Sequence, residues 1–271
     1  MSFLEALCLG FIQGLTEFLP VSSSGHLVLG RHVLGLDASG LAFDVVVHVA
    51  TLIATLLYYR HTIRDMGSAS IVFLRGSDKS FATLRANESL WLLVLVGAAS
   101  VPTGLIGLTC KELVEPLFAS PKISSAMLVL TGCVLLTSLK KPDQEKGLLA
   151  FGLRAAFLVG VVQGLAILPG ISRSGSTIVC ALLLGLNRES AARLSFLMAI
   201  PAILGALLLE LRAISLLETE LVLPMMVGFA SALCTGLLAL VFLVHIVKRG
   251  KLFAFSFYLI PVGVFGLLWL P

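Results

Sequence analysis

The sequence predicts an all-α polytopic membrane protein, built as an inverted-topology repeat of two halves. Each half contains a re-entrant broken-helix loop plus transmembrane helices. Three observations predict this fold. Of the 271 residues, 58% are hydrophobic and only 13% are charged, about half the charged share of a soluble domain. Apolar runs long enough to cross a bilayer recur along the chain. One stretch near the N-terminus also recurs 150 residues later.

The apolar segments fall into two kinds. Two regions, 3–36 and 155–187, are interrupted by LPVSSSG and LPGISRSG. Proline has no N–H to donate and biases the residue before it away from helix, so each region is predicted to form two half-helices around a break. Uninterrupted spans are predicted at 41–59, 90–109, 123–139, 190–210, 221–247 and 252–270.

The distribution of lysine and arginine predicts the topology. Fourteen lie in the loops at 60–88, 140–154, 188–193 and 248–251, and only four lie in the loops at 31–44, 109–122 and 211–220. By the positive-inside rule the first group is cytoplasmic. The six spans then connect these loops only if both interrupted regions are re-entrant. Region 3–36 would dip from the outer face and region 155–187 from the cytoplasmic face.

An internal repeat supports this topology. GFIQGLTEFLPVSSSG at 10–25 aligns without gaps to GVVQGLAILPGISRSG at 160–175. Repeats of opposite insertion are typical of folds whose site lies at the repeat interface near the bilayer midplane. We therefore expect one integral membrane domain over 1–271, with halves of about 1–140 and 141–271, and the two broken loops facing each other.

The first loop carries residues that could bind and process an anion. Gln13 and Glu17 are four apart and share one face of the first half-helix. The free N–H groups at the start of the next half-helix, with the helix dipole, make an anion site. His26 follows about one turn later. A serine hydroxyl beside an acid or base is a candidate nucleophile.

The second loop repeats this arrangement and adds Arg173, whose guanidinium suits phosphate oxygens. Together the two loops suit a phosphate or diphosphate, with Glu17 and His26 able to move protons. The candidate phosphate-binding residues are Ser22, Ser24, Gly25, Ser172, Ser174, Gly175 and Thr177, and Gln13 is a supporting residue.

Each feature also has a structural interpretation. The serines could serve only as helix caps, Glu17 and Arg173 as a structural ion pair, and His26 as a core histidine. Their joint occurrence in two related loops favours function. His48 and Glu210 lie in single spans without such a cluster, so we expect both to be structural.

Several function classes lack support. GxGxxG, the Walker lysine pattern, HExxH and metal-ligand spacing are absent from the sequence, and its basic residues are spread over short loops. Nucleotide hydrolysis, zinc chemistry and nucleic-acid binding are therefore not indicated. Glu17 is the single carboxylate near the predicted site. We expect a divalent cation, Mg²⁺ or Ca²⁺, to arrive with the diphosphate, helped by Glu17.

The motifs QGLTEFLPVSSSGH and PGISRSGST closely resemble the two signatures of the bacterial undecaprenyl-diphosphatase (bacitracin-resistance) family, and the resemblance covers the whole chain. It implies a phosphatase of the bacterial cytoplasmic (inner) membrane. Such an enzyme converts undecaprenyl diphosphate to the monophosphate for peptidoglycan synthesis and so gives bacitracin resistance. By position the resemblance implicates Glu17, Ser23, His26 and Arg173 as catalytic. Two positions differ from the familiar pattern: Gln13 stands where a first glutamate is expected, and Ser24 where a threonine is expected.

Several alternatives stay open at this stage. The attacking group is Ser23, a water molecule or His26, and the sequence does not divide the proton transfers between Glu17 and His26. A polyprenyl-phosphate transporter or flippase would use the same fold and the same anion clamp. The prenyl tail would lie against lipid-facing helices, with access to the site expected from the outer (periplasmic) side. Small-xxx-small patterns are compatible with a homodimer.

Overall fold

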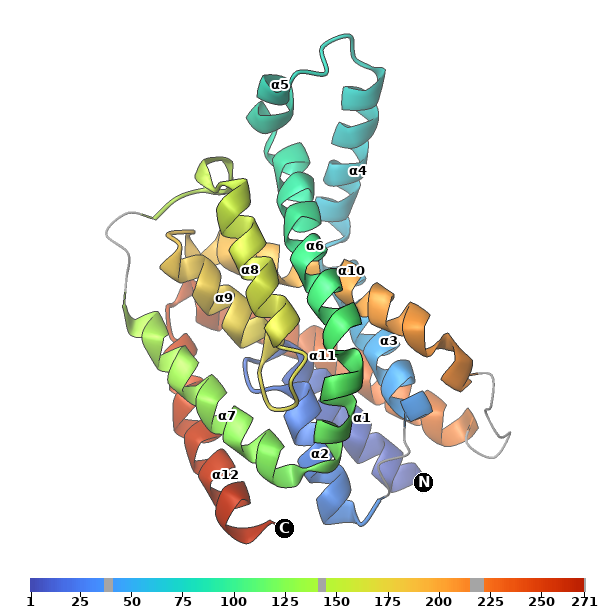
Figure 1. The fold of residues 1–271 in the computed structure, drawn as a ribbon. Coiled ribbons are helices and arrows are strands. Elements are labelled where there is room, and N and C mark those ends of the chain that lie inside the picture. The colour runs from blue at the N-terminus through green and yellow to red at the C-terminus, as the bar shows by residue number, and fades with distance from the viewer. Residues whose placement is uncertain (37–40, 141–144, 215–221, 271) are drawn as a thin grey trace.

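The computed structural model describes residues 1–36, 41–140, 145–214 and 222–270, and over these ranges it is a helical bundle (Figure 1). The α-helices are α1 Phe3–Phe18, α2 Ser23–Leu34, α3 Leu41–Tyr58, α4 Arg60–Arg75, α5 Phe81–Ala86, α6 Glu88–Val114, α7 Pro121–Leu136, α8 Leu153–Leu165, α9 Arg173–Leu183, α10 Arg188–Ile214, α11 Val222–Lys248 and α12 Ser256–Trp269. Short 3-10 helices are η1 Glu115–Ala119, η2 Thr137–Leu139, η3 Leu148–Ala150 and η5 Leu252–Phe255.

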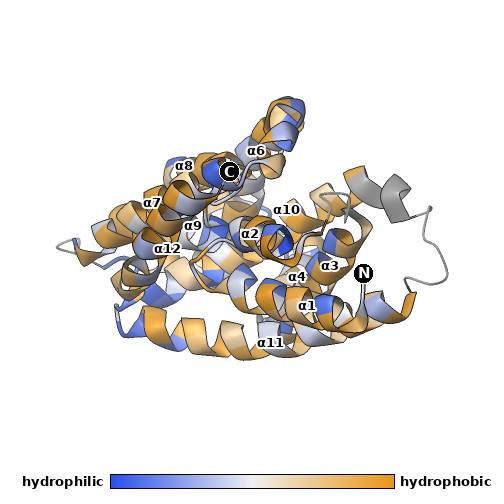
Figure 2. Cartoon of the chain, turned by 90° about the horizontal axis from the view of Figure 1, so that it is seen from below, coloured by the Kyte–Doolittle hydropathy of each residue, from blue (hydrophilic) through white to orange (hydrophobic). Residues whose placement is uncertain are grey.

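Within the described ranges, five helical segments are long and apolar enough to cross a membrane: 88–119, 121–139, 188–209, 222–248 and 252–269. The α3–α4 pair, bent by 70°, makes a sixth when it is counted as one span. The all-helical, multi-pass architecture predicted from the sequence is therefore confirmed. Hydrophobic residues run along most helices in Figure 2, and many large ones are exposed, among them Leu105, Leu238 and Phe257, as expected for surfaces that meet lipid rather than water.

The segment 60–88 differs from the prediction of a loop. It contains the helices α4 and α5, and α4 packs against α6 (Figure 1). Hydropathy alone missed α4 because this helix is amphipathic and rich in charge. Met66 is buried on one of its faces, while Arg64 and Arg75 are exposed.

Both interrupted regions are broken where the sequence predicts. α1 ends at Phe18 and α2 begins at Ser23, while α8 ends at Leu165 and α9 begins at Arg173. The four half-helices contain 16, 12, 13 and 11 residues, each fewer than the ~20 that a transmembrane helix needs. In the second break Gly170 has a φ of 97°, a conformation that favours glycine.

The half-helices are held by close contact with long helices from the other part of the chain. α1 packs along α11, and α8 packs along α6. A Cβ added at Gly160 of α8 would lie 2.0 Å from the carbonyl oxygen of Ala99 in α6. One added at Gly10 of α1 would lie 2.3 Å from the carbonyl oxygen of Gly228 in α11. These two glycines therefore allow the backbones of the paired helices to approach each other closely.

The two breaks touch each other inside the bundle. Ser174 Oγ donates a hydrogen bond of 3.3 Å to the carbonyl oxygen of Leu19. A Cβ added at Gly25 would lie 2.9 Å from Gly170 Cα, and one added at Gly175 would lie 3.0 Å from Pro20 Cβ. The first residues of α2 and α9 are thereby brought to the same place.

The α8–α6 contact yields a stability prediction. Gly160→Ala should lower the free energy of unfolding by about 1–3 kcal/mol, because the added methyl group overlaps the α6 backbone. Gly104→Ala, in α6 itself, is the matched control because nothing lies within 4 Å of its added Cβ. Thermal denaturation of both purified variants in one detergent measures the difference. Equal melting temperatures would contradict the packing described.

Candidate active site

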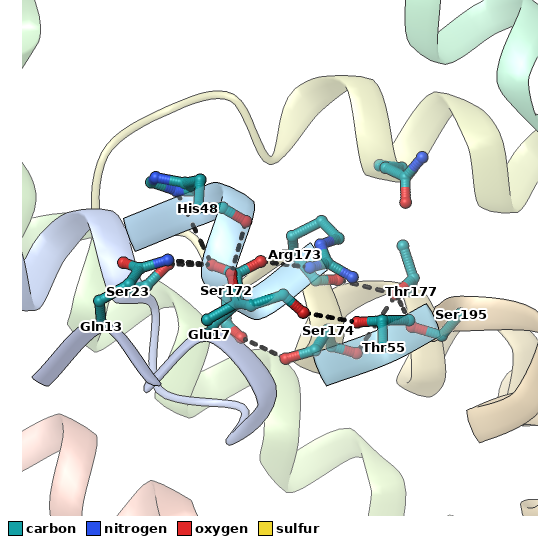
Figure 3. Close-up of polar contacts among 12 residues, drawn as sticks. Gln13, Glu17, Ser23, His48, Thr55, Ser172, Arg173, Ser174, Thr177 and Ser195 are labelled. Carbon is teal, nitrogen blue, oxygen red and sulfur yellow. Dashed lines mark hydrogen bonds and ion pairs between the residues drawn. The ribbon is translucent and has the colours of Figure 1, made fainter. Parts of the chain in front are cut away.

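Glu17 lies at the centre of the polar cluster between the two breaks (Figure 3). Its side chain is only 7% exposed. One carboxylate oxygen, Oε1, forms an ion pair with Arg173, and the other, Oε2, accepts hydrogen bonds from Ser23 Oγ at 2.8 Å and Gln13 Nε2 at 3.0 Å. His48 Nε2 lies 3.9 Å from Oε2. A buried carboxylate is thus neutralised and hydrogen-bonded, as burial requires.

Local structure explains how these groups converge. Gln13 and Glu17 lie one turn apart on α1, so both side chains face the same way. Ser23 is the first residue of α2 and Arg173 is the first residue of α9. Because the breaks touch, the first residues of two half-helices distant in sequence reach the same carboxylate.

Both half-helices begin with the same cap. Ser22 Oγ accepts from the backbone N–H of Gly25 at 3.3 Å, and Ser172 Oγ accepts from that of Gly175 at 3.1 Å. Each capping hydroxyl also lies 3.3 Å from the hydroxyl two residues on, that of Ser24 or Ser174. Side-chain caps of this kind fix where a helix starts.

Ser22 has a strained backbone. Its φ is 70°, and it is the one non-glycine with positive φ among the described residues. A residue held there is destabilised by about 1–3 kcal/mol and persists because its surroundings over-determine it. The cap to Gly25 and a contact with His26, described below, are two of those constraints.

The hydroxyls of the second break are already engaged. Ser172 caps α9, and Ser174 bonds to Leu19. Thr177 Oγ1 donates to the carbonyl of Arg173 at 2.7 Å and lies 2.6 Å from Ser195 Oγ. These side chains hold the loop in place, and their role as phosphate contacts stays a prediction.

His26 stands apart from the Glu17 cluster. Its Nδ1 lies 2.8 Å from the carbonyl oxygen of Ser22, and its Nε2 lies 2.8 Å from the hydroxyl of Tyr258 on α12. Of the four predicted catalytic residues, the structure therefore brings Glu17, Ser23 and Arg173 into direct contact. His26 lies one helical turn away from Ser23.

Two residues of this region, His48 and Tyr258, were not assigned to the site from the sequence. His48, on α3, was expected to be structural, yet its Nε2 faces Glu17 while its Nδ1 bonds to the carbonyl of Asp44 at 2.7 Å. The position of His48, an ionisable residue inside an apolar span, could have indicated a functional role. Nothing in the sequence pointed to Tyr258, because a tyrosine near a helix end is common in membrane proteins. Glu210, also expected to be structural, has a side chain outside the part that the structure describes.

Two polar atoms of the cluster have no partner. Arg173 Nη1 and Gln13 Oε1 are both buried and make no hydrogen bond to any residue that the structure describes. An unsatisfied buried polar group costs about 1–3 kcal/mol. One atom is a cationic donor and the other an acceptor, so a bound ligand could satisfy both. Among the described residues no group of three or more His, Cys, Asp and Glu is placed to hold a metal ion.

The arrangement is suited to nucleophilic attack on an anion. A serine hydroxyl that already donates to a carboxylate can lose its proton as it attacks. A guanidinium with a free N–H can bind the oxygens of the group under attack. His26 offers a second titratable group one turn away.

The sequence matches the family model described as bacitracin resistance protein BacA over residues 6–265. It is similar to proteins named undecaprenyl-diphosphatase from several organisms. It is 42% identical to that of Desulfosudis oleivorans, covering 97% of each chain. It is 41% identical to that of Halothermothrix orenii, covering 97% of this chain and 96% of the other. It is 43% identical to that of Korarchaeum cryptofilum, covering 97% and 98%.

The buried ion pair yields a second stability prediction. Glu17→Gln keeps the shape of the side chain but leaves the Arg173 guanidinium without its anion, so unfolding should become easier by about 3 kcal/mol. The matched control is Glu88→Gln. Its partner Arg193 and Glu88 itself are 29% and 53% exposed, and an exposed pair contributes at most ~1 kcal/mol. Detergent denaturation curves measure both, and similar losses would contradict a special role for the Glu17–Arg173 pair.

Proposed function

The chain belongs to the bacitracin resistance protein BacA family, and on that premise we propose that it hydrolyses undecaprenyl diphosphate to undecaprenyl phosphate and inorganic phosphate. It thereby recycles the lipid carrier of peptidoglycan synthesis and gives bacitracin resistance. The observation that carries this proposal is the contact of Ser23 and Arg173 with one buried carboxylate, Glu17. A nucleophile, a base and an anion-binding group are what hydrolysis of a phosphate anhydride requires.

The proposed first step is attack by Ser23. Its Oγ forms a bond to the terminal phosphorus as the bond from that phosphorus to the bridging oxygen breaks, which releases undecaprenyl phosphate. The serine proton passes to Glu17 Oε2, 2.8 Å away. Water then attacks the phosphoserine, inorganic phosphate leaves, and Ser23 recovers its proton. Direct attack by water that Glu17 activates gives the same products without the phosphoserine.

Arg173 is proposed to hold the diphosphate throughout. One guanidinium nitrogen pairs with Glu17, and the unpartnered Nη1 is available to a phosphate oxygen. A guanidinium stays charged and binds phosphate in a planar fork, so it can stabilise the charge that develops during transfer. The free N–H groups at the starts of α2 and α9 add further donors.

A divalent cation, Mg²⁺ or Ca²⁺, is proposed to enter with the diphosphate. Within the described residues, this site offers one carboxylate, Glu17, and the unpartnered amide oxygen of Gln13. This donor set is too small for a protein cage, but it fits an ion carried largely by substrate phosphates. When bound, such an ion would offset the negative charge of the diphosphate.

The substrate tail is proposed to lie in the membrane beside His26. An apolar groove of about 370 Å³ is formed there by α1, α2 and α12, and its lining includes Ile12, Leu29 and Val262. Its walls are almost entirely hydrocarbon, as a prenyl chain requires. The groove runs along the same helix that presents Ser23, so a tail and a headgroup could be bound together.

We further propose that the chain is one domain over 1–271 and an inverted-topology repeat, with halves of about 1–140 and 141–271. Positions 150 apart play equivalent parts: Ser22 and Ser172 both cap, and Gly25 meets Gly170 as Gly175 meets Pro20. The α1–α11 contact likewise has a counterpart in α8–α6. The half-helices are also too short to span, which supports two re-entrant loops.

The proposed location is the cytoplasmic (inner) membrane, with the Glu17 site open to the outer side. Orientation is testable in a background without cysteine. Lys122→Cys, at the start of α7, should react with a membrane-impermeant maleimide in intact spheroplasts. Lys79→Cys, between α4 and α5, should react only after permeabilisation. Both positions are exposed, so the two variants control for each other. The reverse pattern would overturn the orientation.

Activity is predicted from purified protein in detergent supplied with undecaprenyl diphosphate. Wild type should release phosphate, and Glu17→Gln should lower kcat about 100- to 10,000-fold, as loss of a general base does. Ser23→Ala should release no phosphate if the Ser23 hydroxyl is the attacking group. EDTA should suppress turnover until Mg²⁺ or Ca²⁺ is restored. Ser70→Ala is the control, because that hydroxyl bonds only to its own helix at Met66.

The outcomes separate the alternatives. Phosphate release by well-folded wild type, lost in well-folded Ser23→Ala and Glu17→Gln, supports hydrolysis at this site. If Ser23→Ala stays active while Glu17→Gln does not, water is the attacking group. No release with cation supplied would overturn the enzyme and favour a polyprenyl-phosphate transporter, which the same repeat would suit. Undiminished turnover in EDTA would overturn the proposed cation.

A further inference from the structure

The contact between His26 and Tyr258 is not used by the chemistry proposed above. We propose that Tyr258 is a positioning residue that acts through His26, orienting its imidazole for the reaction. The inference rests on the proposed function, because it deepens the description of the same site. It concerns a residue of α12, which lies 232 positions from His26 in the sequence.

The hydrogen bonds define the state of the imidazole. A backbone carbonyl can only accept, so the 2.8 Å contact with Ser22 requires His26 Nδ1 to carry a hydrogen. In the neutral ring Nε2 is then a bare acceptor, and the Tyr258 hydroxyl, 2.8 Å away, donates to it. Between them the two partners set both the tautomer and the rotation of the ring.

Ring contact reinforces this orientation. The His26 and Tyr258 rings lie 5.7 Å apart between centroids, with an interplanar angle of 15°. A stacked pair resists rotation of either ring. Stacking, however, needs no hydroxyl, whereas the bond to Nε2 does. The two contributions can therefore be separated by removing the oxygen alone.

The helix that carries Tyr258 is held firmly, although the Tyr258 side chain itself is 47% exposed. α12 packs along α7, and the approach is close at two glycines. A Cβ added at Gly132 would lie 2.6 Å from Ile260 Cγ1, and one added at Gly263 would lie 2.6 Å from the carbonyl oxygen of Ser125. A hydroxyl on so tightly seated a helix is a fixed reference point for a ring on the shorter α2.

The chemistry of a phenol suits this task. A tyrosine hydroxyl both donates and accepts. It can donate to neutral His26 and accept from Nε2–H once His26 is protonated. His26 can therefore gain or lose a proton without turning away from the site. Because His26 lies one turn from Ser23 and lines the apolar groove, its ring would lie beside a headgroup held at Ser23, where it could take part in the proton transfers.

The test is a double-mutant cycle on kcat in full-length protein. Tyr258→Phe keeps the stacked ring and removes the hydrogen bond, so kcat should fall about 3- to 10-fold with KM changed less than about twofold. In a His26→Ala background the same change should have almost no effect, since the group through which Tyr258 acts is gone. Tyr58→Phe is the matched control: Tyr58 packs on Tyr59, and its hydroxyl has no hydrogen-bond partner among the residues that the structure describes.

A second measurement does not depend on turnover. Ring ¹⁵N resonances of histidine-labelled protein in micelles, assigned with His26→Ala, should identify His26 as the Nδ1–H tautomer. Tyr258→Phe should shift the Nε2 resonance, and Tyr58→Phe should leave it unchanged. An unchanged His26 spectrum in Tyr258→Phe would overturn the positioning role, even if the activity of His26→Ala is too low to measure.

Failure of this inference is distinguishable from failure of the proposed function. Inactive wild type would overturn the function, and the ring resonances would still report on the contact. Active wild type, combined with equal losses from Tyr258→Phe with and without His26, would overturn the positioning role alone. Loss of activity that tracks a lowered melting temperature in Tyr258→Phe would likewise assign Tyr258 to packing.

Discussion

The structure depends on keeping one carboxylate, Glu17, charged inside an apolar protein. A lone charge at the bilayer centre is unfavourable by ~2.5–3.5 kcal/mol even on the milder scale, and α1 alone supplies only the amide of Gln13. The compensating cation comes from Arg173, 156 positions away. The ion pair can form only where the two breaks meet, so it requires the close packing of α1 on α11 and of α8 on α6.

Broken helices meet this requirement better than continuous ones. Each break exposes backbone N–H groups that a continuous helix would bond internally, and the serine caps satisfy part of that potential. Irregular backbone at membrane depth is tolerated where it is buried in protein. The prolines that interrupt helices and the glycines that let the loops touch are thus parts of one design. They create the polar ends and bring these ends together.

Much of this could be predicted from local pattern. The apolar spans, both breaks and the meeting of the two loops follow from hydropathy, proline chemistry and the repeat. The ion pair of Glu17 with Arg173 was one of two interpretations of these charges, and the hydrogen bond from Ser23 to Glu17 became visible only in the structure. The helix α4 could not be found that way, since its charge hides an amphipathic face. Contacts with His48 and Tyr258 depend on how distant helices pack, which one sequence does not specify. The hydrogen bonds that Ser174 and Thr177 make within the protein could not be predicted either, because a motif specifies residue types and not hydrogen-bond partners.

The shared carboxylate also has a consequence for stoichiometry. Ser23 and Arg173 occupy the same register in their half-helices, yet both reach Glu17, and the position equivalent to Glu17 in the second loop is Ile167. The described part of the chain therefore has two such breaks but assembles one polar centre between them. The second break supplies one cation, Arg173. Its other polar side chains, Ser172 and Ser174, cap α9 and bond to the first break. Each polypeptide should accordingly accommodate one headgroup at a time, and a half-length chain could not assemble the centre alone.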